Sequence, residues 1–399
     1  KTELDNYLVT HLTSISCKIA EVFVRILHLF SNWKWTGPAE HALNAATYFV
    51  DRGYDITFAC GKPPSGVEDS LEKRAKKSGL NLANKFYLNK HLHVWHDAVD
   101  VVRLKTFIKK ENIELIHTHL FNDHFLAGVA ARCLSKRILI VRTVYDGLGL
   151  TYSTRNRVLL SYLTDGLIVV SETSKNVMKN NFNFSSEKIW NICPGVDCDR
   201  FNQKIDGSKA RKRFGISLSN PVVGIVARVQ THRRFEVFLK SIEYAVKEVP
   251  QLKVFIIGRG THIQEVAIKP VEVLGLKDHV VFTGYRLEDY TEILAALDIK
   301  VFLVPGSDGS CRAVREAMAM GKPVIVANRG MLPEIVEDGI SGLVVEDTPE
   351  NLAHAIINLA KDVGLREKMG EAARKRMIED FNLDAQLAKV EGVYKNLSS

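Results

Sequence analysis

The sequence lacks the features that would fix a membrane span, a disulfide framework or a zinc ribbon. No uninterrupted apolar run of about 20 residues occurs in its 399 residues, so we predict no membrane-spanning helix. The six cysteines lie scattered on apolar segments, without a CxxC pair or a regular spacing. Such a pattern argues against both disulfide bridges and a cysteine zinc site, and it favours the reducing cytoplasm.

What the sequence does contain is typical of a folded protein with sizeable cores. The composition is 46% hydrophobic and 25% charged, and the length suggests two or three domains. The net charge of +8 arises from short basic clusters such as residues 73–77 and 105–110, rather than from one long run. These clusters suit anionic partners, either phosphates or a lipid surface. Nucleic acid is the weaker interpretation, because no recognition motif accompanies the charge.

The first 24 residues predict an amphipathic helix. Their apolar side chains recur at intervals of three and four, at Leu8, Leu12, Ile15, Ile19 and Val22. Charged residues interrupt the segment and no small-residue cleavage site follows, so we do not expect a signal peptide. A helix docked on the protein's own surface is favoured over one lying on a bilayer.

From residue 25 onward, short apolar runs alternate with amphipathic stretches, which predicts parallel sheets flanked by helices. The strands expected in the first half are residues 25–30, 54–59, 113–119, 137–144 and 166–171, with helices at 40–52 and 99–110. The pattern restarts at Pro221, with strands at 222–229, 252–258, 279–284, 299–305, 323–328 and 342–346, and a helix at 237–249. The economical interpretation is an α/β protein of two doubly wound, Rossmann-like domains.

The change between the two halves falls in the polar, basic stretch at 194–219. We therefore expect an N-terminal extension (1–24), a first domain (25–200), a second domain (201–380) and a C-terminal helix (381–399). The last two helices, at about 365–381 and 384–397, could pack on either half. Ligands of such domains lie beyond the carboxyl ends of the strands, so we expect the active site in a cleft between the domains.

The most informative segment is residues 304–323, VPGSDGSCRAVREAMAMGKP. An apolar strand leads into a glycine-rich turn, and Ser310 can cap a helix that runs to about Met320. Free N–H groups at a helix start attract phosphate, and Asp308 and Glu316 could bind sugar hydroxyls beside it. The simpler interpretation is an ordinary strand, turn and helix with solvated acids.

With their surroundings, these residues resemble the retaining nucleotide-sugar glycosyltransferases of family four, which have the GT-B fold. The similarity covers residues 25–397, and its most specific part is a carboxylate, seven residues, a glutamate and AMAMGKPVI, followed by RGMLPEIVEDGISGLVVED. The strand and loop VVGIVARVQTHRRF are also similar to the family's, with Arg228 in the arginine position and Arg233 in place of a lysine. The family usually has Glu where this sequence has Asp308.

The first half resembles the family less closely. Gly37, at a predicted helix start, resembles the family's glycine-rich loop, but Pro38 stands where a second glycine is usual. Tyr145 replaces the histidine that many relatives carry after the fifth strand. His119 is a candidate substitute because strand ends face the cleft. It shares a strand face with His117, so a metal pair is conceivable, although no third ligand is apparent and a packed histidine is the leading alternative.

The resemblance implies transfer of a sugar from a nucleoside diphosphate to an acceptor hydroxyl. Two arginines, Arg228 and Arg233, would neutralise the departing diphosphate through bidentate contacts, together with helix N–H groups. The remaining implied contacts to the donor sugar and nucleotide are Gly37, Tyr285, Arg286, Asp308, Gly309, Ser310, Cys311 and Glu316. No DxD motif stands in a suitable loop and the arginines can supply the positive charge, so neither a metal ion nor another cofactor is expected.

Two other functions remain open, a GT-B nucleotide-sugar 2-epimerase and a nucleotide-sugar-binding protein without transferase activity. The residues that fit the first are lacking, and only the missing histidine favours the second. Cell-surface glycan, glycolipid and lipopolysaccharide synthesis are the processes that the resemblance suggests. We expect a cytoplasmic protein, with peripheral contact to the inner face of the membrane as a further expectation.

Overall fold

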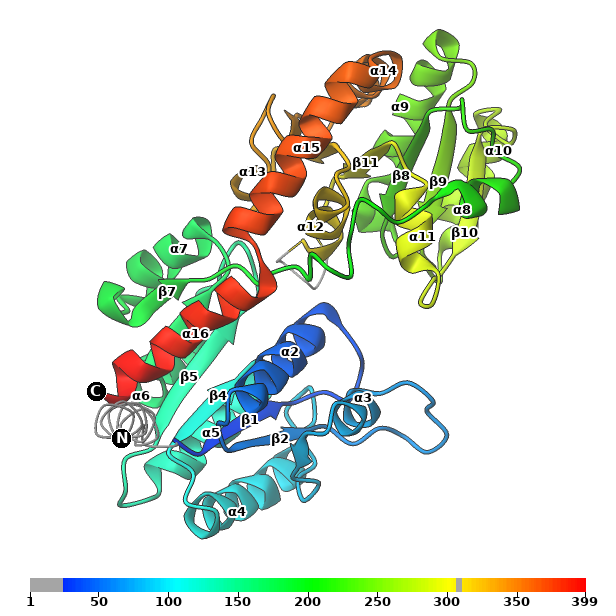
Figure 1. Cartoon of the computed structure of the whole chain (residues 1–399). Coiled ribbons are helices and arrows are strands. Elements are labelled where there is room, and N and C mark those ends of the chain that lie inside the picture. The colour runs from blue at the N-terminus through cyan, green and yellow to red at the C-terminus, as the bar shows by residue number, and fades with distance from the viewer. Residues whose placement is uncertain (1–23, 306–310) are drawn as a thin grey trace, which may run out of the picture. The chain divides into compact units, whose positions relative to one another are not determined.

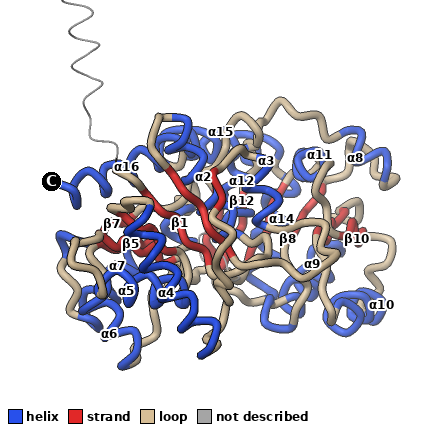
Figure 2. Tube along the Cα trace, turned by 90° about the horizontal axis from the view of Figure 1, so that it is seen from below, coloured by secondary structure: helices blue, strands red, loops and turns tan. Residues whose placement is uncertain are grey.

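The computed structural model describes residues 24–305 and 311–399, and it contains two parallel β-sheets with helices between and around their strands (Figures 1 and 2). The predicted N-terminal helix lies outside the described residues. Contacts divide the chain into two compact units, one of 24–35 and Ala42–Arg142 and the other of Thr36–His41 and Thr143–Ser399. The domain limits predicted from the sequence remain a prediction. Among the described residues, no helix is long and apolar enough to cross a membrane.

The first sheet has seven strands in the order β3-β2-β1-β4-β5-β6-β7. Its strands are β1 Ile26–Phe30, β2 Ile56–Cys60, β3 Asn81–Leu82, β4 Leu115–Thr118, β5 Leu139–Val144, β6 Gly166–Val169 and β7 Ile189–Asn191. The helices among them are α2 Gly37–Asp51, α3 Leu71–Lys77, α4 Val94–Lys110, α5 Phe121–Arg132, α6 Thr154–Leu163 and α7 Glu172–Phe182. The chain order reverses between β1 and β4, and ligands of doubly wound sheets bind at such a switch point.

The second sheet has six strands in the order β10-β9-β8-β11-β12-β13, with its switch point between β8 and β11. Its strands are β8 Val222–Val226, β9 Lys253–Ile257, β10 Val280–Gly284, β11 Ile299–Phe302, β12 Val324–Ala327 and β13 Gly342–Val345. Its helices include α8 Ser208–Arg213, α9 Phe235–Glu248, α10 Lys269–Val273, α11 Tyr290–Ala295, α12 Arg312–Ala319, α13 Leu332–Ile335, α14 Pro349–Lys361 and α15 Val363–Asp380. The structure also has short turns of helix, η1 Ser186–Lys188, η2 Thr231–Arg233 and η3 Gln264–Ile268.

Both faces of the second sheet are buried, which explains the continuous apolar runs of its strands. Val223, Ile225 and Val301 pack with α9 and α14 on one face. Phe255 and Phe302 pack with α11 and α12 on the other. The predicted fold class, two Rossmann-like parallel sheets, is confirmed.

The last two helices divide between different neighbours, a point that the sequence left open. α15 packs on α12 and α14. The final helix, α16 Leu383–Ser398, packs on β6, where Leu397 lies so close to Gly166 that a Cβ at this glycine would be 2.7 Å from Leu397 Cδ1. The chain thus ends on a strand of the first sheet.

Candidate functional site

The two predicted arginines lie in the loop that follows β8, at the switch point of the second sheet. The Arg228 side chain is exposed. Arg233 is half-buried, and its Nη1 donates a hydrogen bond of 2.6 Å to the carbonyl oxygen of Val304, just beyond β11. The loop after β8 is therefore bonded to the chain that follows β11, which brings two segments 71 residues apart to the same edge of the sheet.

Backbone hydrogen bonds join the ends of β8 and β9 at this edge. The N–H groups of Ala227 and Val229 donate to the carbonyls of Ile257 and Arg259, each at 3.1 Å. Glycine is required opposite them, because a Cβ on Gly258 would be 2.1 Å from Ala227 O, and one on Gly260 would be 1.8 Å from Val229 O. The two glycines thus allow the two backbone segments to lie close together. Their contacts hold the start of the loop that carries Arg228 and Arg233, which we call the arginine loop.

Tyr285 and Arg286, the two residues predicted to contact the base, differ in their surroundings. The Tyr285 side chain is exposed, whereas the Arg286 side chain is hydrogen-bonded within its own loop. Tyr285 is 49% exposed, and the Arg259 guanidinium lies 4.5 Å from the centre of its ring. Arg286 Nε donates to the carbonyl of Thr283 at 2.7 Å, and its Nη1 lies 3.3 Å from an Asp289 carboxylate oxygen. The Arg286 side chain is therefore already bonded to neighbouring residues of its loop. Tyr285 is the better candidate for contact with the base of a nucleotide.

Glu316 is buried in α12, with its carboxylate held by two side chains. The Tyr290 hydroxyl donates to Oε2 at 2.7 Å, and Arg312 Nε lies 3.2 Å from Oε1. Burial raises the pKa of Tyr290 well above its ordinary value, and the negative charge of Glu316 adds to the increase, so the phenol remains a neutral donor. The arrangement fixes the position of a carboxylate that is only 3% exposed.

The sequence missed Tyr290 as a partner of Glu316, since 26 positions separate them. It also placed the start of the helix one residue too early. The helix begins at Arg312, and its N-cap position is taken by the buried Cys311 in a left-handed conformation with φ 53°. The predicted residues Asp308, Gly309 and Ser310 lie outside the described residues.

A lysine is buried in this part of the second sheet. Lys300 in β11 is fully buried, and its Nζ lies 6.0 Å from the centre of the Phe302 ring. This Nζ has no hydrogen-bond partner among the residues that the structure describes. Burial lowers its pKa to about 7, while the Glu316 carboxylate acts in the opposite direction. The sequence did not reveal this electrostatic interaction between Lys300 and Glu316.

The remaining predicted residues belong to the first sheet. Gly37 begins α2 as predicted, and the Thr36 hydroxyl accepts from the Ala39 N–H at 3.4 Å. Tyr145, directly after β5, is buried with its ring stacked on His41 at 5.8 Å. His119 is 1% exposed and lies with other histidines.

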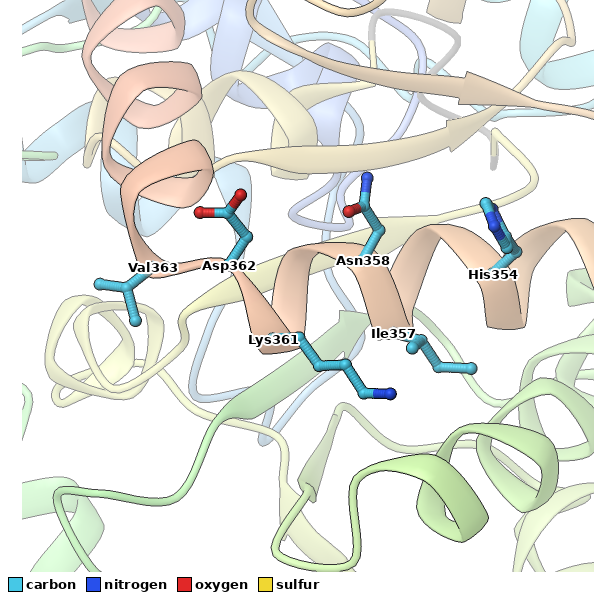
Figure 3. A pocket seen from close by; sticks show the side chains of 6 residues that line it. All are labelled: His354, Ile357, Asn358, Lys361, Asp362 and Val363. Atoms are coloured by element: carbon cyan, nitrogen blue, oxygen red, sulfur yellow. The ribbon is translucent and has the colours of Figure 1, made fainter.

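A surface pocket on α14 contains none of the predicted residues. Figure 3 shows that its side chains come from α14 and the start of α15, and they are His354, Ile357, Asn358, Lys361, Asp362 and Val363. The Asp362 carboxylate already accepts from the Leu365 N–H at 2.8 Å as the cap of α15. We assign no ligand to this pocket.

Comparisons with known proteins agree with the arrangement. Residues 206–376 match the family model described as Glycosyl transferases group 1, and residues 35–200 match that described as Glycosyltransferase Family 4. An Escherichia coli protein named UDP-Gal:alpha-D-GlcNAc-diphosphoundecaprenol alpha-1,3-galactosyltransferase is 25% identical over 397 residues, which is 96% of this chain and 98% of that protein. The N-acetyl-alpha-D-glucosaminyl L-malate synthase of Bacillus anthracis is 25% identical over 75% of this chain and 79% of its own.

Solved structures show the same architecture. Anabaena HepE in complex with UDP has a TM-score of 0.79 at 20% identity, and the match covers 94% of this chain and 100% of that one. A glycosyltransferase from Rickettsia africae has a TM-score of 0.82 at 18% identity, covering 95% of this chain and 100% of that one. At these identities the likeness establishes the fold.

Proposed function

The chain belongs to the glycosyltransferases of family four and has the GT-B fold, and from this premise we propose that it transfers a sugar from a nucleoside diphosphate to an acceptor hydroxyl with retention of the anomeric configuration. The observation that carries the proposal is the Glu316 carboxylate, buried and oriented by Tyr290 and Arg312. A fixed carboxylate suits the paired hydroxyls of a ribose. Because the carboxylate is already oriented, it does not have to move when the donor binds.

The arginine loop supports the second half of the proposal, the departure of the diphosphate. Arg228 and Arg233 follow the same strand, and guanidinium groups can bind phosphate oxygens bidentately. We propose that these two cations, with no metal ion, offset the negative charge that grows on the leaving phosphate. A further proposal is that the leaving phosphate helps to deprotonate the acceptor on the same face of the sugar.

We propose a uridine nucleotide as the donor. The Anabaena HepE structure contains UDP, and the Escherichia coli relative, which matches over almost its full length, is named for UDP-Gal. Cell-surface glycan or glycolipid synthesis is the proposed process, because that relative is named for a lipid-linked acceptor.

A thermal-shift panel of UDP, GDP, ADP and their sugar conjugates tests the donor site. We expect UDP and its conjugates to raise the melting temperature, by an amount equivalent to about 2.7 kcal/mol when the ligand is at 100 times its Kd. Glu316→Ala and Arg228→Ala should lose the shift, whereas Arg157→Ala, which removes an exposed arginine from α6, should keep it.

No shift with any nucleotide at millimolar concentration would contradict the donor proposal. Incubating the UDP-sugar alone distinguishes the alternatives: a 2-epimerase would interconvert the donor without an acceptor, and a binding protein would leave it unchanged. Retention is tested by determining the anomeric configuration of the product by NMR.

We also propose that the protein contacts an anionic lipid surface peripherally. The exposed side chains of α4 support this contact. Trp95 and Val102, seven positions apart on one helix face, are 79% and 65% exposed, and Val94 beside them is 80% exposed. The two acids of the helix, Asp97 and Asp100, are buried. The exposed charges of α4 are therefore cations, at Arg103, Lys105, Lys109 and Lys110. Apolar and basic side chains together suit the interface of an acidic bilayer.

Sedimentation with lipid vesicles checks this contact. We expect binding to phosphatidylglycerol-containing vesicles that weakens with salt, and little binding to phosphatidylcholine alone. Trp95→Ser should lower the partition coefficient about tenfold, since it removes a large apolar side chain from the interface. Tyr162→Ser, at a residue of α6 that is 71% exposed, is the matched control. Equal binding of the two variants would contradict the assignment to α4.

A further inference from the structure

Three histidines converge on one face of the first sheet. His28 in β1 lies directly opposite His117 in the register of the parallel pair, so both side chains point to the same face. His119 is two residues beyond His117 and continues on that face. All three are buried, at 0%, 2% and 1% exposed. The third histidine comes from a strand 89 positions earlier in the chain, which is why the sequence offered only a pair.

The spacing of the ring nitrogens suits a shared metal ion. One nitrogen from each ring lies within 4.8 Å of the other two. His28 Nδ1 and His119 Nε2 are 3.3 Å apart. Two ligands at about 2.0–2.1 Å from a tetrahedral zinc ion stand about 3.3–3.4 Å from each other. The separation of these two nitrogens therefore agrees with two ligands of one zinc ion. It also agrees with a hydrogen bond between the rings.

Aromatic side chains surround the three imidazoles. The ring centres of Phe49 and Phe58 each lie 6.4 Å from that of His28, and Phe30 lies 6.1 Å from His119. These apolar rings shield the ligand atoms from solvent, and such a shell controls how water reaches a metal site.

The loop after β4 is also held in place. The Asp123 carboxylate accepts from the backbone N–H groups of His119 and Ser31, at 3.1 and 2.7 Å. These bonds join the ends of β4 and β1 and fix where His119 lies relative to His28. When the ligands are already held in place, the entropic cost of ordering them on metal binding is smaller.

We propose that His28, His117 and His119 bind one Zn²⁺ ion at the switch point of the first sheet. Imidazole nitrogen suits zinc, and three protein ligands leave a fourth tetrahedral position for water or another group. The ion would tie β1 to β4. The proposed ligands belong to the first sheet, whereas the arginines proposed to bind the phosphates follow a strand of the second sheet, so either proposal can fail alone.

The test begins with the whole chain refolded with ZnCl₂ or CoCl₂ and freed of loose metal by gel filtration. We expect one ion per chain, a visible Co²⁺ spectrum typical of tetrahedral coordination, and a higher melting temperature than in the chelator-treated protein. His28→Gln and His119→Gln should retain no ion. The control is His93→Ala/His96→Ala, which removes an alternative histidine pair whose ring centres are 3.9 Å apart in and before α4. It should retain the ion fully.

X-ray absorption at the zinc edge of the wild-type protein decides the question even if the buried variants fail to fold. Three imidazole nitrogens at about 2.0 Å would support the site. Absence of a retained ion, or loss of it in the His93/His96 variant alone, would overturn the proposal and leave the three residues as a buried cluster of packed histidines.

Discussion

Glu316→Gln is expected to lower kcat/KM about 100-fold. Glutamine keeps the size of the side chain but removes the charge, and hydrogen bonds to a charged group contribute about 1.5–3 kcal/mol each. At about 1.4 kcal/mol for each factor of ten, two weakened ribose contacts account for the loss. The effect should fall mainly on the KM for the donor, because the ribose contacts are the same in the ground state and the transition state. Steady-state kinetics with varied UDP-sugar measures it.

Two variants separate a role in binding from one in folding. Tyr290→Phe retains the carboxylate but removes the hydroxyl that donates to it at 2.7 Å, so we expect a smaller loss of about tenfold. Glu367→Gln, at an exposed position of α15, should behave as the wild type. Wild-type kinetics in Glu316→Gln, with an unchanged melting temperature, would remove this residue from the donor site.

Lys300→Met is expected to stabilise the protein near neutral pH and to change how stability depends on pH. The lysine has a pKa of about 7 in the folded protein against an ordinary value of 10.5. Between these values the unfolded state binds more protons, so the wild-type free energy of unfolding rises with pH by up to about 1.4 kcal/mol per pH unit. Below about pH 7 the full cost of burying the charge is present. Methionine has a similar length and no charge to bury.

Urea denaturation at several values between about pH 6 and pH 10 checks this expectation. At pH 6 to 7 the free energy of unfolding of Lys300→Met should exceed that of the wild type by several kcal/mol, with about 5 kcal/mol as the upper bound that the pKa difference allows. The difference should shrink as pH rises through this range. Lys389→Met removes an exposed lysine of α16 and should leave the profile unchanged. If the stability of Lys300→Met and that of the wild type depended on pH in the same way, the pKa of Lys300 would not be lowered in the folded protein.

Most strands were predictable because a buried parallel strand needs apolar side chains on both faces. Residues 222–226 are an example, and they form β8 within the predicted run. Helix α14 was missed although its start is visible in the sequence: Thr348 accepts from the Asn351 N–H, and Pro349 occupies the first turn. That signal could have located the helix. Nothing comparable marks the short β3, which depends on its pairing with β2.

Local patterns in the chain predicted the two parallel sheets, the arginines after β8 and the position of Glu316 in a helix, because each depends on apolar periodicity or on a local motif. Which distant side chains meet became visible only in the folded chain. Strand order places β1 beside β4 and so brings His28 to His117, and helix packing brings Tyr290 to Glu316. It also buries Lys300 without a hydrogen-bond partner among the described residues, and it bonds Arg286 to Thr283 within one loop. Such pairings depend on register and packing between elements far apart in the chain, and no local pattern encodes them.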